Sequence, residues 1–385
     1  MNSLALHELH HGLHAHFGEL NSAEVVNDYD DWLAEHAALR ETAGVIDLSF
    51  RSRICLVGAD RARYLHGQVT NDVKKLRVGE GCYSAITTAK GKMESDLNIF
   101  VLADELLLDF EPGLTEKISA RLERFIVADD VQIVDAAPHY GLLSVQGPKA
   151  EAVVRAIDLF EEIPAKPLGS VKISDATLGE IYLVNHARLD GTQGRAGSPL
   201  PADGAHGVTH PTNLGFDLFI PNNSLGAVAD KLIAAANQIG GRAVGWQAFE
   251  TVRIEAGIPR FGADMDETNI PLECGIESRA IVYNKGCYIG QEVINRIHSV
   301  GHVNKELRAL RLADDLKMLP QRGDKLFHAG KEVGYVTSAV KSPALNANIA
   351  FGYVRREANQ TGNELTLRTA GSESLAKIVE LPLVK

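Results

Sequence analysis

After about Val303 the sequence changes to short apolar runs separated by Gly, Pro, Asn and Asp. The runs expected to be strands are Leu307–Leu312, Lys325–His328, Val333–Val340, Ile349–Val354 and Glu364–Leu367. Short strands at regular spacing, bounded by turn residues, are typical of a small barrel or sandwich. The sequence therefore predicts a β-rich C-terminal domain that begins near 301–307.

Before this point, strand-like and helix-like segments alternate. The strands are often close neighbours, as at Leu97–Leu102 and Glu105–Phe110, and amphipathic helices are expected at Leu114–Phe125 and Leu225–Gln238. Closely spaced strands indicate hairpins, which favour an α+β fold over a doubly wound parallel sheet. Residues 1–50 are expected to be mainly helical.

Four histidines near the N-terminus repeat with the period of a helix. His7, His10, His11 and His14 would lie on one helical face. Such a face is either a metal-binding patch or a solvated surface, and no carboxylate or cysteine stands beside it at ligand spacing. The solvated surface is the favoured interpretation.

Composition excludes several functional classes. The 385 residues suggest two or three domains, and the formal net charge of −11 argues against direct nucleic-acid binding. No apolar run reaches the length of a membrane span, so no membrane association is expected. Four scattered cysteines, without CxxC or metal-ligand spacing, predict no stably bound metal and fit a reducing, cytoplasmic compartment.

The sequence Lys285-Gly286-Cys287-Tyr288-Ile289-Gly290-Gln291-Glu292 holds one cysteine between two glycines, just before a helix expected from about Val293. A helix N-terminus and a nearby ammonium group both favour a thiolate. The alternative is a helix-capping turn with a small, inert thiol. A second distinctive segment, 187–213, is rich in Gly and Pro and is interpreted as an inserted surface loop.

Motifs along nearly the whole chain resemble the glycine-cleavage T-protein superfamily and, within it, the YgfZ-type folate-binding proteins. The KGCYIGQE motif, with Arg296 beyond it, is typical of the YgfZ branch. The other matching segments are 35–40, 44–49, 58–73, 90–97, 146–150, 253–259, 265–268 and 334–343.

The resemblance implies a three-domain α+β ring around a folate site, closed by a small C-terminal β-barrel, and we expect a monomer. It divides the chain into N-terminal helices that pack on the folate region, two α+β domains and the barrel. The corresponding ranges are 1–50, 51–150, 151–302 (with the 187–213 loop and the cysteine motif) and 303–385.

The resemblance also implies roles for three residues at a tetrahydrofolate site. Glu255 matches a glutamate of the pterin pocket, although a solvated or helix-paired carboxylate would look the same in sequence. Phe249 is placed where relatives carry a stacking aromatic side chain, and core packing explains it equally well. Asp96 matches the aspartate beside the reacting folate nitrogens, where it would orient the amine; otherwise it is a strand-edge residue.

Cys287 implies a separate chemistry. An accessible thiolate could ligate iron transiently or accept a sulfur species, but a cluster needs about four ligands, so an iron–sulfur partner protein would have to contribute. Lys285 is expected to tune the thiol. The remaining motif residues are expected to shape the loop or contact that partner: Gly286, Tyr288, Gly290, Gln291, Glu292 and Arg296.

These features lead to two functional hypotheses. The first is a tetrahydrofolate-binding accessory protein for iron–sulfur cluster assembly or repair, with an indirect effect on tRNA modification. The alternative is a folate-dependent aminomethyltransferase or other one-carbon transferase, which the presence of Asp96 keeps open.

Overall fold

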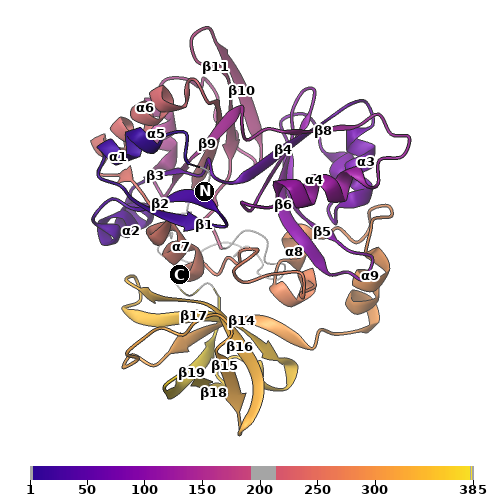
Figure 1. Cartoon of the computed structure of the whole chain (residues 1–385), viewed down its shortest axis with the longest axis vertical. Helices are drawn as coiled ribbons and strands as arrows, with labels where there is room; N and C mark the ends of the chain where they lie inside the picture. The colour runs from indigo at the N-terminus through magenta and orange to yellow at the C-terminus, as the bar shows by residue number, and fades with distance from the viewer. Residues whose placement is uncertain (1–2, 192–213, 382, 384–385) are drawn as a thin grey trace, which may run out of the picture.

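The computed structural model describes residues 3–191, 214–381 and 383, so most of the expected loop at 187–213 lies outside the described residues. Two β-sheets with their helices lie side by side, and the C-terminal barrel sits against one end of the pair (Figure 1). This arrangement confirms the prediction of an α+β fold that ends in a barrel. No helix of the described chain is long and apolar enough to cross a membrane.

One sheet has six strands in the order β10-β11-β12-β9-β3-β13. All neighbours are antiparallel except β3 and β13. Helices α5 (Ala150–Ala156) and α6 (Leu225–Gln238) bury their apolar side chains against it in one core. The strands are β3 Gly44–Asp47, β9 Tyr140–Gln146, β10 Ser170–Asp175, β11 Gly179–Asn185, β12 Gly215–Pro221 and β13 Arg242–Ala243.

The second sheet has five antiparallel strands in the order β5-β6-β7-β4-β8. Helices α3 (Arg61–Gln68) and α4 (Thr115–Glu123) cover it through a core that includes Leu65, Ile118 and Leu122. Its strands are β4 Ser52–Val57, β5 Gly81–Thr87, β6 Met93–Val101, β7 Leu106–Phe110 and β8 Gln132–Asp135, and a short 3₁₀ turn, η1, spans Val73–Lys75.

The C-terminal strands close into a barrel in the order β14-β17-β16-β15-β18-β19. Five of them overlap the predicted runs, and the sixth, β19, was not among those runs. The strands are β14 Lys305–Leu312, β15 Lys325–His328, β16 Lys331–Ser342, β17 Ala347–Arg355, β18 Glu364–Arg368 and β19 Glu373–Val379, with a 3₁₀ turn, η3, at Arg356–Ala358.

The elements that link the sheets to the barrel are mostly short helices. Helix α7 (Trp246–Glu255) packs on α2 (Trp32–Glu41) and also contacts the barrel strands β16 and β17. The others are η2 Pro271–Cys274, α8 Glu277–Ala280 and α9 Gln291–Val300.

The expectation that residues 1–50 are mainly helical is wrong. Helix α1 covers only His7–Gly12, and a hairpin of β1 (His16–Leu20) and β2 (Ala23–Asp28) follows it. The turn of this hairpin is formed by Asn21 and Ser22, both with positive φ. Asparagine tolerates this left-handed conformation better than most residues, so a two-residue hairpin competes with the helix here.

The histidines of this segment have structural partners. His10 is buried, and its Nε2 lies 2.9 Å from Asp47 Oδ2; His7 Nδ1 lies 2.9 Å from Glu24 Oε2. Within the described residues, no group of three or more His, Cys, Asp or Glu side chains is arranged to hold a metal ion. Two of the four histidines therefore contribute to packing rather than to a solvated face.

The hydrogen-bonded sheets cut across the segments expected from the sequence. Strand β9 falls within 51–150, yet it pairs with β3 and β12 of the six-stranded sheet. Strand β3 falls within 1–50 and belongs to the same sheet. Strand pairing distant in sequence, rather than chain order, sets the division between the two sheets.

Glu35 on α2 provides a test of how the N-terminal hairpin is held. Its buried carboxylate accepts the backbone N–H of Tyr29 at 2.6 Å and of Gly245 at 2.8 Å. Replacing Glu35 with Ala would leave two buried N–H groups without an acceptor, which should lower the free energy of unfolding by about 2–5 kcal/mol. Denaturant unfolding would measure the loss. The matched control is Glu41→Ala, an exposed position on the same helix, expected to change stability by less than about 0.5 kcal/mol. Equal unfolding midpoints for the two variants would contradict this account.

Candidate functional site

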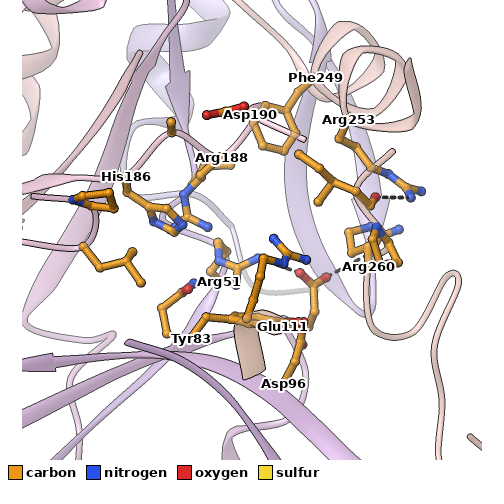
Figure 2. A pocket seen from close by; sticks show the side chains of 18 of the residues that line it. Arg51, Tyr83, Asp96, Glu111, His186, Arg188, Asp190, Phe249, Arg253 and Arg260 are labelled. Atoms are coloured by element: carbon orange, nitrogen blue, oxygen red, sulfur yellow. Dashed lines mark hydrogen bonds and ion pairs between the residues drawn. The ribbon is translucent and has the colours of Figure 1, made fainter. Parts of the chain in front are cut away.

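A cavity of about 490 Å³ opens where the two sheets and α7 meet. Side chains converge on it from both sides, with His186 and Arg188 opposite Arg253 and Arg260, and with Arg51 and Glu111 between them (Figure 2). The other lining residues are Leu48, Asn71, Cys82, Tyr83, Asp96, Asn98, Pro167, Leu168, Ala187, Asp190, Trp246, Phe249, Ile258, Pro259 and Arg279. This volume lies in the range of small-molecule sites.

Asp96 on β6 lies in this cavity, as expected for a ligand-binding carboxylate. The Tyr83 hydroxyl on the neighbouring strand β5 donates a hydrogen bond to its Oδ2 at 2.7 Å. Burial, followed by the negative charge of Glu111, raises the pKa of Asp96 to about 6. The hydrogen bond from Tyr83 and the positive charge of Arg51 lower this pKa, but their effects are smaller. Asp96 is therefore poised to exchange a proton near neutral pH.

Glu111 is held between two arginines from different parts of the chain. Arg51 Nη1 lies 2.6 Å from Glu111 Oε1, and Arg260 Nη1 lies 2.8 Å from Glu111 Oε2 (Figure 2). Arg260 also lies over the Trp246 ring at 5.2 Å. Because each oxygen of Glu111 is paired with a guanidinium group, this carboxylate is held in place and contributes negative charge to the cavity.

Arg188 joins the two sheets at the edge of the cavity. Its Nη2 lies 2.8 Å from Asp109 on β7 and 2.7 Å from Asp217 on β12. Burial alone would raise the pKa of Asp109, but Arg51 and Arg188 outweigh it and hold that pKa well below its usual range. His186 Nδ1 lies 2.7 Å from Asp217 as well. These contacts fix the loop after β11 at the cavity.

Trp246 and Phe249 form an aromatic wall on α7. Their rings stack with centroids 5.5 Å apart and an interplanar angle of 28°. Both line the cavity, although Phe249 is only 7% exposed. The structure thus brings Phe249 and Asp96 to one site, and Phe249 also packs in the core, as the alternative interpretation had it.

Glu255, expected in the pterin pocket, does not line this cavity. Its carboxylate is fully buried and accepts hydrogen bonds from His36 Nε2 at 2.9 Å and from Ser342 Oγ at 2.5 Å, with Arg40 at 3.8 Å. These partners belong to α2 and to the barrel strand β16. Both oxygens are therefore committed to joining α7, α2 and the barrel, which corrects the prediction.

Lys285 has a structural role beside its expected effect on the thiol. Its buried ammonium donates hydrogen bonds to the backbone carbonyls of His66 at 2.6 Å, Val69 at 2.6 Å and Asn71 at 2.7 Å. Burial, the largest effect, lowers the pKa of Lys285 to about 8. The side chain is thus directed to the end of α3, where it anchors the motif.

Cys287 is exposed and is not among the residues that line the cavity. It precedes α9 by four residues, so it does not cap that helix. Neighbouring Tyr288 is buried, and the Lys285 ammonium lies 4.9 Å from its ring centroid. The motif therefore holds a thiol at the surface on a well-anchored turn.

The end of the motif requires glycine at position 290. Gly290 has φ of +93°, and a Cβ there would lie 2.5 Å from Thr87 Oγ1. Gln291 and Glu292 begin α9, and Arg296 is exposed on it. The positive φ and the close approach of this turn to β5 explain why position 290 is glycine. Gly286 has a φ outside the left-handed region, and the nearest atom to a Cβ there would be 3.4 Å away.

Several cavity residues were missed from the sequence. The sequence does indicate the ion pairs of Arg188, because their acceptors, Asp109 and Asp217, each interrupt an otherwise apolar strand. A charge in such a run indicates a buried partner. Arg188, which supplies it, lies in the segment interpreted as an inserted loop. No local pattern distinguished Arg51, Tyr83, Glu111, Arg260 and Arg279.

Comparison with known proteins places this geometry in context. The model of the GCVT N-terminal domain matches residues 6–186 and 205–285, and that of the glycine cleavage T-protein C-terminal barrel domain matches 305–385. A crystal structure of the glycine cleavage system aminomethyltransferase T from Bartonella henselae superimposes with a TM-score of 0.84. It shares 22% identity and covers 100% of this chain and 98% of its own, which supports the fold.

Proteins named aminomethyltransferase are similar along most of the chain. That of Halalkalibacterium halodurans is 29% identical over 352 residues, which cover 91% of this chain and 89% of the relative. That of Corynebacterium jeikeium is 27% identical, covering 94% and 91%, and that of Halothermothrix orenii is 26% identical over both full lengths. With its two domain matches spanning most of its length, the chain belongs to the glycine cleavage T-protein family.

Proposed function

We propose that this protein transfers a one-carbon unit from an aminomethyl donor to tetrahydrofolate. The observation that carries the proposal is Asp96, a carboxylate with a pKa of about 6 inside a cavity of suitable size. This is the function that the sequence left as the alternative. The similarity to aminomethyltransferases supports it over the iron–sulfur accessory role.

The residues of the cavity fit the chemistry of a reduced folate. The stacked rings of Trp246 and Phe249 offer an apolar face for a flat ring system. Asp96 is an acceptor for ring and amine N–H groups, and guanidinium groups supply positive charge for carboxylates. Tetrahydrofolate supplies the nitrogens that receive the carbon unit.

Asp96 would act as the proton acceptor in this reaction. In its charged form it accepts the proton from the folate nitrogen that bonds to the incoming carbon, and it can return a proton to the departing amine. A pKa of about 6 suits both directions, because a general base works best when its pKa is near the ambient pH. Tyr83 holds the carboxylate in position by its hydrogen bond.

The pH dependence of the transfer tests this role. Asp96 is active as the carboxylate. Raising the pH from 5 to 7 should therefore increase kcat/KM with a midpoint near pH 6, because protonated Asp96 cannot accept a proton. Replacing Asp96 with Asn should remove this limb and lower kcat/KM by about 10²–10⁴-fold. Formation of methylenetetrahydrofolate from an aminomethyl donor is the measurement.

The control for this prediction is Asp104→Asn, which changes an exposed carboxylate in the turn between β6 and β7. It should keep both the rate and the acid limb. An unchanged rate in Asp96→Asn would overturn the proposed role, and the absence of tetrahydrofolate binding to the unmodified protein would overturn the function itself.

A second candidate function is favoured by the position of Cys287. The exposed thiol is held on a turn that Lys285 anchors with three hydrogen bonds, outside the cavity. Such a surface thiol is available to a partner protein, as a YgfZ-type role in iron–sulfur cluster assembly or repair requires. Under this hypothesis the thiol and the folate cavity act as separate sites.

Replacing Cys287 with Ala separates the two functions. Because the thiol does not line the cavity, tetrahydrofolate affinity and transfer rate should change by less than about twofold. If the accessory role holds, the same variant should fail to restore iron–sulfur enzyme activity in a strain that lacks this protein, whereas Cys55→Ala, at a buried cysteine outside the cavity, should restore it. Full restoration by Cys287→Ala would exclude the accessory role.

A further inference from the structure

A second cavity lies between the two sheets and shares no lining residue with the cavity that contains Asp96. This junction pocket has a volume of about 310 Å³. Its lining residues come mainly from β4, β7 and β8 of the five-stranded sheet and from β9, β11 and β12 of the six-stranded sheet. The volume is at the lower end of the range for small-molecule sites.

The floor of the junction pocket is apolar. Leu102, Leu107 and Phe219 line it, and all three are buried in the core that the two sheets share. The Phe219 ring lies 5.6 Å from that of Phe100, which in turn lies 6.4 Å from the ring of His186 in the Asp96 cavity. Aromatic side chains therefore lie between the two cavities, and the floor suits the hydrocarbon body of a ligand.

The wall of the junction pocket is aromatic and carries one carboxylate. Tyr140 and Tyr182 are half-buried in this wall, and neither hydroxyl has a hydrogen-bond partner among the described residues. Glu105, in the turn before β7, is also half-buried and lines the same pocket. Within the part of the chain that the structure describes, no cationic side chain lies within ion-pair distance of its carboxylate.

The neighbours of Glu105 show that its charge acts inside the junction pocket. Burial raises the pKa of the Cys55 thiol, and the charge of Glu105 raises it further. The pKa of Tyr182 is raised by burial and then by Glu180 and Glu105. Glu180 is paired with Lys172 at 2.8 Å, and the Lys172 ammonium lies 5.9 Å from the Tyr182 ring centroid. Glu105 is therefore the carboxylate whose charge is not balanced by a neighbouring ion pair.

These features together favour one class of ligand. A half-buried carboxylate beside an apolar floor loses part of its hydration without gaining a cationic partner. A compact organic cation would supply the positive charge, and the faces of aromatic rings also attract cations. A neutral molecule of the same shape would gain the apolar contact alone, and an anion would be repelled.

We propose that the junction pocket binds a small apolar amine in its ammonium form, with the ammonium group at Glu105 and the hydrocarbon body on the apolar floor. This inference goes beyond the proposed transfer reaction and does not depend on it, because the two cavities have different lining residues.

The test is an equilibrium titration with two probes of nearly equal size, 2-phenylethylamine and 2-phenylethanol. The unmodified protein should bind the amine about 10- to 100-fold more tightly than the alcohol, the range expected for a charge-assisted contact. Glu105→Gln should reduce this ratio to about one by weakening the amine alone, because glutamine keeps the shape and polarity of the side chain but not its charge. Added tetrahydrofolate should leave the affinity for the amine unchanged.

Asp104→Asn is the matched control, because Asp104 is an exposed carboxylate next to Glu105 that does not line the junction pocket. It should leave the ratio unchanged. The assignment would be overturned by the absence of saturable amine binding, by equal affinities of the two probes, or by a ratio that Glu105→Gln does not lower. Displacement of the amine by tetrahydrofolate would also overturn it, since the amine would then occupy the Asp96 cavity. The proposed transfer function would stand in each of these cases.

Discussion

The ion pairs of Arg188 with Asp109 and Asp217 are the interaction on which the cavity depends. Each aspartate lies on an apolar strand of a different sheet, and each is fully buried. Removing one member of a buried pair of this kind typically costs about 3–5 kcal/mol, because the remaining charge stays buried without a partner. The guanidinium group therefore fixes how the two sheets meet, and Arg51 strengthens the arrangement through a second contact with Asp109 at 2.7 Å.

The same network of arginines explains why the pKa values of Asp109 and Asp96 are shifted in opposite directions. Asp109 contacts two guanidinium groups, which hold its pKa well below its usual range. Asp96 accepts a hydrogen bond from the neutral hydroxyl of Tyr83 instead of pairing with a guanidinium group. The effect of burial therefore dominates and raises the pKa of Asp96 to about 6. Glu111 adds negative charge near Asp96 while both of its own oxygens are engaged. The distribution of arginines thus separates two buried carboxylates, since the pKa of Asp109 is held low while that of Asp96 is raised to about 6.

The thiol motif belongs to a different part of the molecule. Lys285 ties it to the carbonyls at the end of α3, and Gly290 allows its turn to pass close to β5. Cys287 remains at the surface. Any chemistry of this thiol would therefore be directed outward to a partner, independently of a ligand in the cavity.

The sequence by itself determined a β-rich C-terminal domain, most strands of the five-stranded sheet and the longer helices, because local period and turn residues control these elements. The pattern left a barrel or a sandwich open, and the resemblance favoured the barrel. Its resemblance to known motifs also identified Asp96 and Phe249, which the fold brings to one cavity. Only the tertiary structure decided which charges are committed elsewhere. Glu255 looked like a ligand-binding residue but is consumed by His36 and Ser342, and Arg188 looked like part of a loop but joins two sheets. Such pairings connect residues far apart in the chain, and no local pattern specifies which distant partner a charge will find.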